Sequence, residues 1–195
     1  FRGACTEAEL QETAKSLRLA NLTQQKESGL DWIPSNDFSF YDGMLDTAFL
    51  LNAVPKRYRE LGLAPLDTYF AAARGYQGDK GDVKALAMKK WFNTNYHYMV
   101  PELEDDTVIC LADEKPFHLY QEAKAAGVET KPVVIGAYTF LKLAVYNGKK
   151  TAADFKVKKL IEKLDSQKLK SDCYKTETSN LMNVLAKYAE LKLKK

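Results

Sequence analysis

Residues Lys90–Glu102 read KWFNTNYHYMVPE and contain a tryptophan, a phenylalanine, two tyrosines and a histidine. Aromatic and β-branched residues favour strands, so Thr94–Val100 is predicted to form a buried strand. Pro101 is expected to end this strand, because proline has no N–H for the sheet ladder. Glu102 would then lie just past the strand's carboxyl end, where α/β sheets place their ligands. Taken alone, an aromatic strand is more often simply part of a core.

Helices are predicted on both sides of this stretch. Thr6 and Glu9 fit a capping box, which starts a helix that Gly29 ends. A second helix is expected over Met44–Leu51, closed before Pro55. The remaining helical predictions, from composition and apolar spacing, are residues 66–74 (a helix or an irregular segment), 83–89, 115–126 and 139–145.

Two further short apolar segments, Leu30–Pro34 and Pro132–Gly136, are predicted strands, and Gly75–Gly81 is a predicted loop. The continuous apolar run of Pro132–Gly136 is typical of a parallel sheet that is covered on both faces. Strands that alternate with helices indicate βαβ units, so the predicted fold class is α/β. Three strands are too few to close an eight-stranded barrel, which needs about 250 residues.

The composition is that of a soluble globular protein. The chain has 195 residues, of which 46% are hydrophobic and 28% are charged. No apolar run approaches the roughly 20 residues of a membrane span, and no basic-then-apolar signal pattern is present. Three widely spaced cysteines argue against a disulfide framework and for a reducing compartment. A cytoplasmic location without a membrane partner is therefore expected.

Charge is distributed unevenly along the chain. Residues 1–155 contain 18 basic and 21 acidic side chains, whereas residues 156–195 contain 11 lysines, no arginine and 5 acidic side chains. Nucleic-acid readout favours arginine and interleaved aromatic residues, which this lysine-rich segment lacks, so no nucleic-acid partner is predicted. Apolar spacing predicts a lysine-rich helical hairpin over residues 156–195, whose lysines face solvent. This hairpin could form a separate segment or pack on the domain formed by residues 1–155.

Four stretches occur together in an order that is typical of one family: GLDWIPSNDFSFYDGMLDT (Gly29–Thr47), LDTYFAAARG (Leu66–Gly75), KWFNTNYHYMVPE, and TKPVVIGAYTFLKLA (Thr130–Ala144). Over about residues 1–155 the chain resembles the N-terminal half of the cobalamin-independent methionine synthases, the 5-methyltetrahydropteroyltriglutamate–homocysteine methyltransferases. The chain departs from the family's pattern at Ser35-Asn36 (usually Val-Gly), Gly43 (usually His) and Ala137 (usually Pro). Asn36 can adopt the left-handed conformation that the family's glycine would take.

The resemblance implies a partial (βα) TIM-barrel-like domain over residues 1–155, followed by the C-terminal helical segment. The family transfers a methyl group from a polyglutamylated methyl-folate to homocysteine, with zinc, to make methionine. We therefore expect an N-terminal fragment or truncated homologue that is inactive alone and that works with a C-terminal catalytic half or by self-association. The alternative is a non-catalytic binding or interaction module derived from that domain.

Lys90 is the substrate-binding residue that the resemblance implies, because it matches the family's lysine for the glutamate tail of the folate. An ammonium group on a flexible stem suits a polycarboxylate. The other interpretation is a surface lysine beside Lys89. Asp37, His97 and Glu102 are weaker candidates: the carboxylates could lie at the ends of neighbouring strands, and His97 is more often a hydrogen-bonded core histidine than a ligand or base.

Asp42 is expected to cap a helix. The cysteines and the two histidines, His97 and His118, are scattered singly, whereas a zinc site needs about four clustered ligands. We therefore predict no metal site, no catalytic residue and no cofactor bound by this chain. By resemblance, zinc and homocysteine would be bound only in the C-terminal half of a full-length family enzyme.

Overall fold

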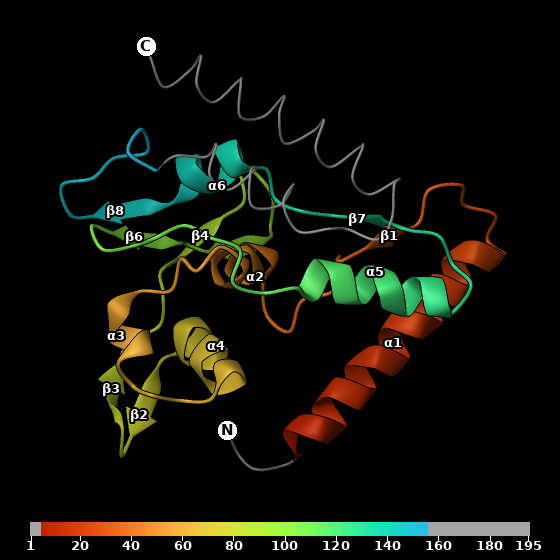
Figure 1. Ribbon diagram of the computed structural model, residues 1–195, viewed down its shortest axis with the longest axis horizontal. Coiled ribbons are helices and arrows are strands. Elements are labelled where there is room, and N and C mark those ends of the chain that lie inside the picture. The colour runs from red at the N-terminus through yellow and green to blue at the C-terminus, as the bar shows by residue number, and fades with distance from the viewer. Residues whose placement is uncertain (1–4, 156–195) are drawn as a thin grey trace. The chain divides into compact units, whose positions relative to one another are not determined.

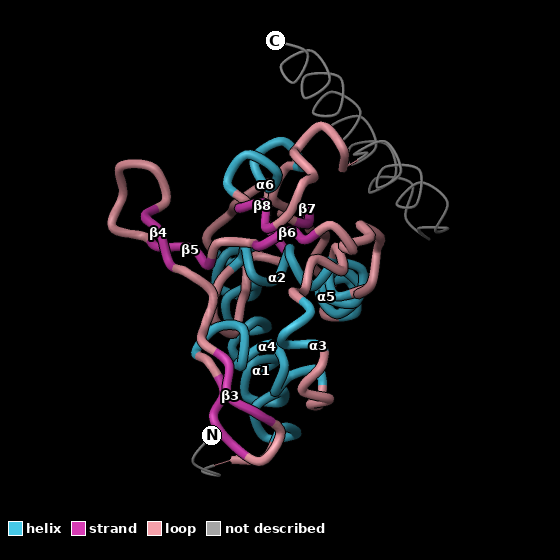
Figure 2. The backbone as a smooth tube through the Cα atoms, turned by 90° about the vertical axis from the view of Figure 1, so that its left-hand side faces the viewer, coloured by secondary structure: helices cyan, strands magenta, loops and turns pink. Residues whose placement is uncertain are grey.

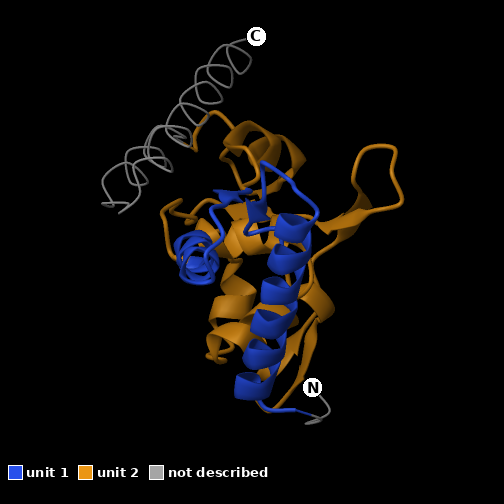
Figure 3. Cartoon of the chain, turned by 90° about the vertical axis from the view of Figure 1, so that its right-hand side faces the viewer, with its two compact units in different colours: residues 1–38, 115–133 blue, residues 39–114, 134–195 orange. Residues whose placement is uncertain are grey.

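The computed structural model describes residues 5–155 and has a mixed α/β architecture (Figure 1), in line with the α/β part of the predicted fold class. The chain divides into two compact units (Figure 3): unit 1 comprises residues 1–38 and 115–133, and unit 2 comprises residues 39–114 and 134–195. The described strands form four two-stranded sheets and no closed barrel. The predicted helical hairpin lies outside the described residues, so the domain boundary at residue 155 stays a prediction.

Unit 1 begins with helix α1 (Glu7–Glu27), whose start is the predicted capping box. The Thr6 hydroxyl accepts a hydrogen bond from the Glu9 amide at 3.2 Å, and the Glu9 carboxylate accepts one from the Thr6 amide at 2.7 Å. Gly29 follows the helix with a φ of 74°, as expected for a residue that ends a helix. Helix α5 (Lys115–Ala125) also confirms its prediction.

The sheet of unit 1 pairs β1 (Pro34–Ser35) in parallel with β7 (Lys131–Pro132). The parallel direction was predicted, but both strands are shorter than expected and β1 begins where the predicted strand Leu30–Pro34 ends. Proline lacks an N–H, which limits the ladder that either strand can form. The unit's small core consists of Leu22, Ile33, Ala123 and Val128.

The helices in the described part of unit 2 largely follow the sequence predictions. They are α2 (Gly43–Leu50), α3 (Lys56–Arg59), α4 (Pro65–Arg74) and α6 (Ala137–Leu143). Only α3, a single turn after Pro55, had no counterpart in the sequence analysis.

The strands of unit 2 differ more from the predictions. Its sheets pair β2 (Tyr76–Gly78) with β3 (Gly81–Val83) and β4 (Met88–Lys90) with β5 (His97–Met99), both antiparallel, and β6 (Glu102–Glu104) with β8 (Val145–Asn147), in parallel. The predicted loop at Gly75–Gly81 is therefore mostly the β2–β3 hairpin. The predicted helix over residues 83–89 is wrong, because backbone hydrogen bonds to distant residues hold this segment extended: the Leu86 amide donates to Ala72 O at 2.9 Å.

The predicted strand Thr94–Val100 is reduced to its last part, β5. Residues Thr94–Tyr96 belong instead to the loop of the β4–β5 hairpin, whose turn lies at Phe92–Asn93. The Trp91 amide donates to Tyr96 O at 2.7 Å and the Thr94 amide donates to Trp91 O at 3.2 Å. Within β5, His97 is exposed and the following two residues are buried, so burial of the whole strand was also a wrong prediction. Pro101 separates β5 from β6, as expected of a strand-ending proline.

Helix α2 lies between the two hydrophobic clusters of unit 2. Met44 and Ala48 belong to a cluster centred on Phe140, which is 1% exposed, and Leu45 belongs to a cluster centred on Tyr58, which is 0% exposed. Strand β5 also contributes to both clusters, through Tyr98 and Met99 respectively. Helix α2 and strand β5, which begins with His97, are therefore both held by these two clusters.

Candidate functional site

The β4–β5 hairpin places Lys90 directly opposite His97. Residues opposite each other in an antiparallel pair share one face of the sheet, with Cβ atoms about 4.5–5.5 Å apart. Both side chains are exposed, and the hairpin with its loop extends away from the rest of the unit 2 backbone (Figure 2). Two of the four predicted site residues are thus brought together on an accessible surface.

The turn of this hairpin is aromatic. The Trp91 ring makes edge-to-face contacts with Phe92, Tyr96 and Tyr98, at centroid distances of 5.2, 6.5 and 5.8 Å. Phe92 and Tyr96 are 71% and 49% exposed. Basic groups and exposed rings therefore occur together in residues 90–97, a combination suited to an anionic ligand that also offers a flat apolar surface.

Asp42 fixes this hairpin to helix α2. Its buried side chain caps the helix, as predicted, by accepting a hydrogen bond from the Leu45 amide at 2.9 Å. The same oxygen accepts from the Met99 amide of β5 at 3.0 Å, and the other oxygen accepts from the Tyr96 hydroxyl. Sequence analysis found the cap but missed these two contacts, because nothing local to Asp42 indicates partners on a distant hairpin.

A second carboxylate supports the segment that leads into α2. Asp46 accepts hydrogen bonds from the Tyr69 hydroxyl at 2.7 Å and the Ser39 hydroxyl at 2.6 Å. The Tyr69 oxygen in turn accepts from the backbone amides of Tyr41 and Asp42, at 3.2 and 3.3 Å. Burial, together with the Asp46 carboxylate, raises the pKa of Tyr69 well above the ordinary value, so this hydroxyl stays a hydrogen-bond donor.

Within this network, the pKa of the Tyr96 hydroxyl is the property that is most readily measured. Burial and then the hydrogen bond to Asp42 raise the pKa of Tyr96 to about 12. In an Asp42→Asn variant we expect the Tyr96 pKa to fall towards, but not reach, the ordinary value of about 10, because the charge is lost while burial remains. The measurement is an alkaline titration of phenolate absorbance, taken as the difference between each protein and its Tyr96→Phe counterpart.

Circular dichroism during the same titration reports whether the chain stays folded. The folded-state pKa of Tyr96 lies above its unfolded value, so its contribution to stability is complete below about pH 10 and is lost as the pH rises towards about 12. An unchanged Tyr96 pKa in the Asp42→Asn variant would contradict the contact between these two side chains.

Glu102 follows β5 as predicted, but it is also the first residue of β6 and its carboxylate is occupied. Arg57 donates to both oxygens, with Nη1–Oε2 and Nη2–Oε1 distances of 2.5 and 3.0 Å, and Asn147 Nδ2 donates to Oε2 at 3.1 Å. The hydrogen bonds that Arg57 donates to Glu102 raise the pKa of Arg57. Bidentate pairing of this kind favours a structural role for Glu102.

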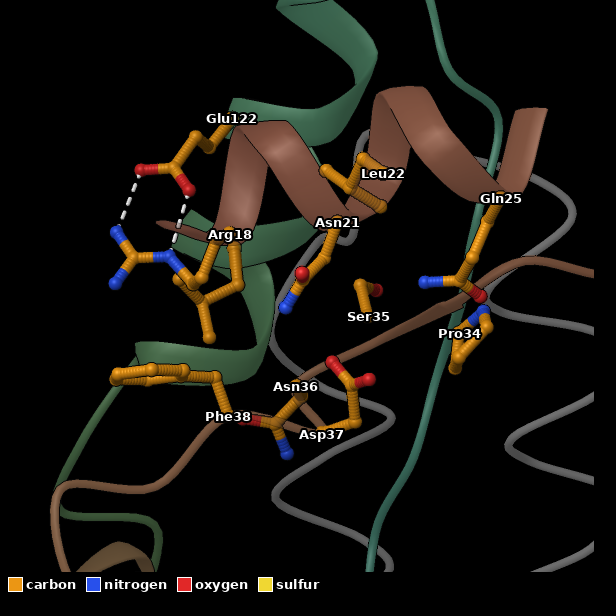
Figure 4. A pocket seen from close by; sticks show the side chains of 11 residues that line it. Arg18, Asn21, Leu22, Gln25, Pro34, Ser35, Asn36, Asp37, Phe38 and Glu122 are labelled. Carbon is orange, nitrogen blue, oxygen red and sulfur yellow. Dashed lines mark hydrogen bonds and ion pairs between the residues drawn. The ribbon is translucent and has the colours of Figure 1, made fainter. Parts of the chain in front are cut away.

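Asp37 belongs to unit 1, where it lines a pocket of about 90 Å³ (Figure 4). Arg18 closes one side by donating to both oxygens of Glu122, each at 2.8 Å. The pocket is enclosed by α1, α5 and the segment that follows β1, and its lining residues are Arg18, Asn21, Leu22, Gln25, Pro34, Ser35, Asn36, Asp37, Phe38, Leu119 and Glu122. The hairpin that holds Lys90 and His97 belongs to unit 2.

Two departures from the family's sequence pattern are accommodated locally. Asn36 has a φ of 58°, the left-handed conformation expected of it, and its Nδ2 donates to Val133 O at 2.6 Å. A Cβ at Gly43 would approach only the Ser39 hydroxyl oxygen, at 3.8 Å. The backbone at Gly43 therefore has room for a first side-chain atom, and its geometry does not require glycine.

Within residues 5–155, no group of three or more His, Cys, Asp or Glu side chains lies close enough together to hold a metal ion. Cys5 and Cys110 carry free thiols. None of the described helices combines the length and the apolar character needed to cross a bilayer.

Comparison with known proteins gives the family. Residues 1–170 match the family described as the cobalamin-independent synthase, N-terminal domain. A 5-methyltetrahydropteroyltriglutamate–homocysteine methyltransferase of Bifidobacterium animalis subsp. lactis is 57% identical over 145 residues, which are 74% of this chain and 19% of the relative. Proteins of the same name from Campylobacter jejuni subsp. doylei and Streptococcus thermophilus are each 54% identical, over 77% and 80% of this chain and 20% and 21% of their own lengths.

The chain spans about a fifth of the length of these curated relatives. The family match covers most of the chain, and more than half of the aligned positions are identical. The resemblance predicted from the sequence is confirmed, and the chain belongs to the cobalamin-independent synthase family, whose N-terminal domain its residues 1–170 match.

Proposed function

We propose that this chain binds the glutamate tail of a folate as the N-terminal part of a methyltransferase that makes methionine from homocysteine and 5-methyltetrahydropteroyltriglutamate. Its relatives are named for that methyl transfer. The single observation that supports the binding role most directly is the exposed position of Lys90 on the hairpin, beside a second basic side chain. By the resemblance to the family, this lysine would bind the glutamate tail of the folate.

The chemistry of Lys90 suits such a ligand. A triglutamate tail offers several carboxylates, which titrate near pH 4.3 and are ionised at neutral pH. Lys90 can reach them as a mobile point charge, while the exposed Phe92 ring offers an apolar surface to the rest of the ligand. The turn is pre-organised by Asp42, which limits the conformational entropy lost on binding.

We propose that methyl transfer itself takes place in another part of the enzyme and not in this chain. The described residues do not supply a zinc-ligand set, and a homocysteine sulfur reacts as the thiolate, which such a set would stabilise. We therefore propose that this chain only binds the substrate and that a C-terminal catalytic half is its partner. The parallel pairs β1–β7 and β6–β8 are in keeping with parts of a TIM-barrel-like architecture, which we propose on the family resemblance.

Replacing Lys90 with alanine is expected to weaken the binding of triglutamyl methyl-folate about tenfold, the equivalent of about 1.4 kcal/mol for one charge-assisted contact. Calorimetric titration of the wild type and the variant measures the change. Lys89→Ala is the matched control, because Lys89 is also exposed but lies opposite Tyr98 on the other face of the hairpin.

Monoglutamyl methyl-folate serves as the matched ligand, because it lacks the extended tail. Its affinity is expected to change little in the Lys90→Ala variant. Equal affinities of the wild type and Lys90→Ala for the triglutamyl form would remove Lys90 from the site and overturn the proposal.

A further inference from the structure

The contacts of His97 indicate which ring nitrogen carries the hydrogen when the ring is neutral. Its Nδ1 lies 3.0 Å from Asn95 O. A carbonyl oxygen only accepts hydrogen bonds, so Nδ1 carries a hydrogen, and Nε2 is the atom that takes up a second proton. Protonation would therefore convert Nε2 from an acceptor into a cationic donor on the same face of the hairpin as Lys90.

His97 has this property alone within its hairpin. Histidine is the residue type that most readily changes charge near neutral pH, and residues 88–99 contain no other histidine. Lys89 lies on the opposite face of the hairpin, beside Tyr98. Tyr96 stays neutral, because its pKa is about 12.

The elements packed against the hairpin also carry charged groups. Helix α2 packs on β5 and presents Asp42 and Asp46, which accept hydrogen bonds from Tyr96 and Tyr69 respectively. Helix α6, whose cluster includes Tyr98 of β5, contributes Lys142. The charge that faces Lys90 is therefore set by the protonation of His97.

We infer that His97 is a pH-dependent second cation of the glutamate-tail site, which binds a carboxylate jointly with Lys90 when it is protonated. Two like charges directly opposite each other on a sheet are unfavourable, so the doubly cationic hairpin is stabilised by a bound anion. By linkage, ligand binding then takes up a proton, and affinity rises as the pH is lowered. This inference rests on the proposed function and extends it to the regulation of the same site.

The test is a calorimetric titration of triglutamyl methyl-folate at about pH 5.5 and about pH 8, on either side of the ordinary histidine pKa. For the wild type we expect affinity about five- to tenfold tighter at the lower pH, the gain of one charge-assisted contact. His97→Gln should bind equally at both pH values and match the wild type at about pH 8. His118→Gln, which removes the other histidine of the chain, is the matched control and should keep the wild-type difference.

Proton uptake gives a readout that a purely structural role of His97 would not change. Titrations in buffers of different ionisation enthalpy should show uptake near neutral pH for the wild type and His118→Gln, and none for His97→Gln. Monoglutamyl methyl-folate, titrated in parallel, separates the tail's contribution from that of the folate rings.

The outcomes separate the two proposals. If Lys90→Ala binds the triglutamyl ligand as the wild type does at both pH values, the tail site itself is overturned. If binding depends on Lys90 but His97→Gln keeps the pH difference and the proton uptake, only the role of His97 is overturned. Circular dichroism of each variant confirms that the exposed substitution at residue 97 leaves the fold intact.

Discussion

Replacing Asp42 with alanine is expected to lower the free energy of unfolding by about 3 kcal/mol. The variant loses the cap of α2, which is worth about 1 kcal/mol. It also leaves the buried Met99 amide without its acceptor, and a buried group left unpaired costs about 1–3 kcal/mol. Urea unfolding followed by circular dichroism measures the difference.

Asp42→Asn provides the comparison within the same site. Asparagine keeps one acceptor oxygen and is as good a helix cap as aspartate, so we expect it to lose about 1 kcal/mol or less. Asp37→Ala, at an exposed aspartate of unit 1, should change stability by no more than about 0.5 kcal/mol. A loss below about 1 kcal/mol for Asp42→Ala would show that the contacts with β5 contribute little.

The helices were predictable because their signals are local. The capping box at Thr6 and the Asp42 cap both operate within a few residues of the helix start, and the structure contains both. Residues 83–89 show the opposite case. Their helical composition is overridden by hydrogen bonds such as that from the Leu86 amide to Ala72 O, which joins positions that local propensity does not connect.

The same difference between local signals and long-range contacts decides which features of the candidate site could be predicted. Lys90 could be proposed as a site residue because the motif around it resembles a family's motif. Its pairing with His97 could not be predicted, because the register of the hairpin depends on the turn that the Trp91 amide closes onto Tyr96 O. The contacts that join Asp42 to Tyr96 and Met99 span 54 and 57 positions of the chain, and no pattern in the local sequence encodes them.

Replacing Phe140 with alanine is expected to be strongly destabilising, with a loss of about 3–5 kcal/mol in the free energy of unfolding. Phe140 is 1% exposed and belongs to the cluster that contains Met44 of α2, Tyr98 of β5 and Leu103 of β6. Truncation would leave a cavity among elements that cannot close around it without moving β5. A loss of this size is a large fraction of the 5–15 kcal/mol that a typical domain has.

The chain offers a matched control in Phe92, which is 71% exposed on the aromatic turn. Phe92→Ala removes the same ring from solvent-facing surface, so we expect the free energy of unfolding to change by no more than about 0.5 kcal/mol. Urea unfolding measures the loss in the free energy of unfolding for both variants, and equal m-values make the two losses comparable. Because both variants remove the same side chain, the difference between the losses reports the effect of burial. Similar losses for the two phenylalanines would contradict the placement of Phe140 in the core. Because the same cluster fixes Tyr98, a destabilised Phe140→Ala protein should also lose the β4–β5 register that places His97 opposite Lys90.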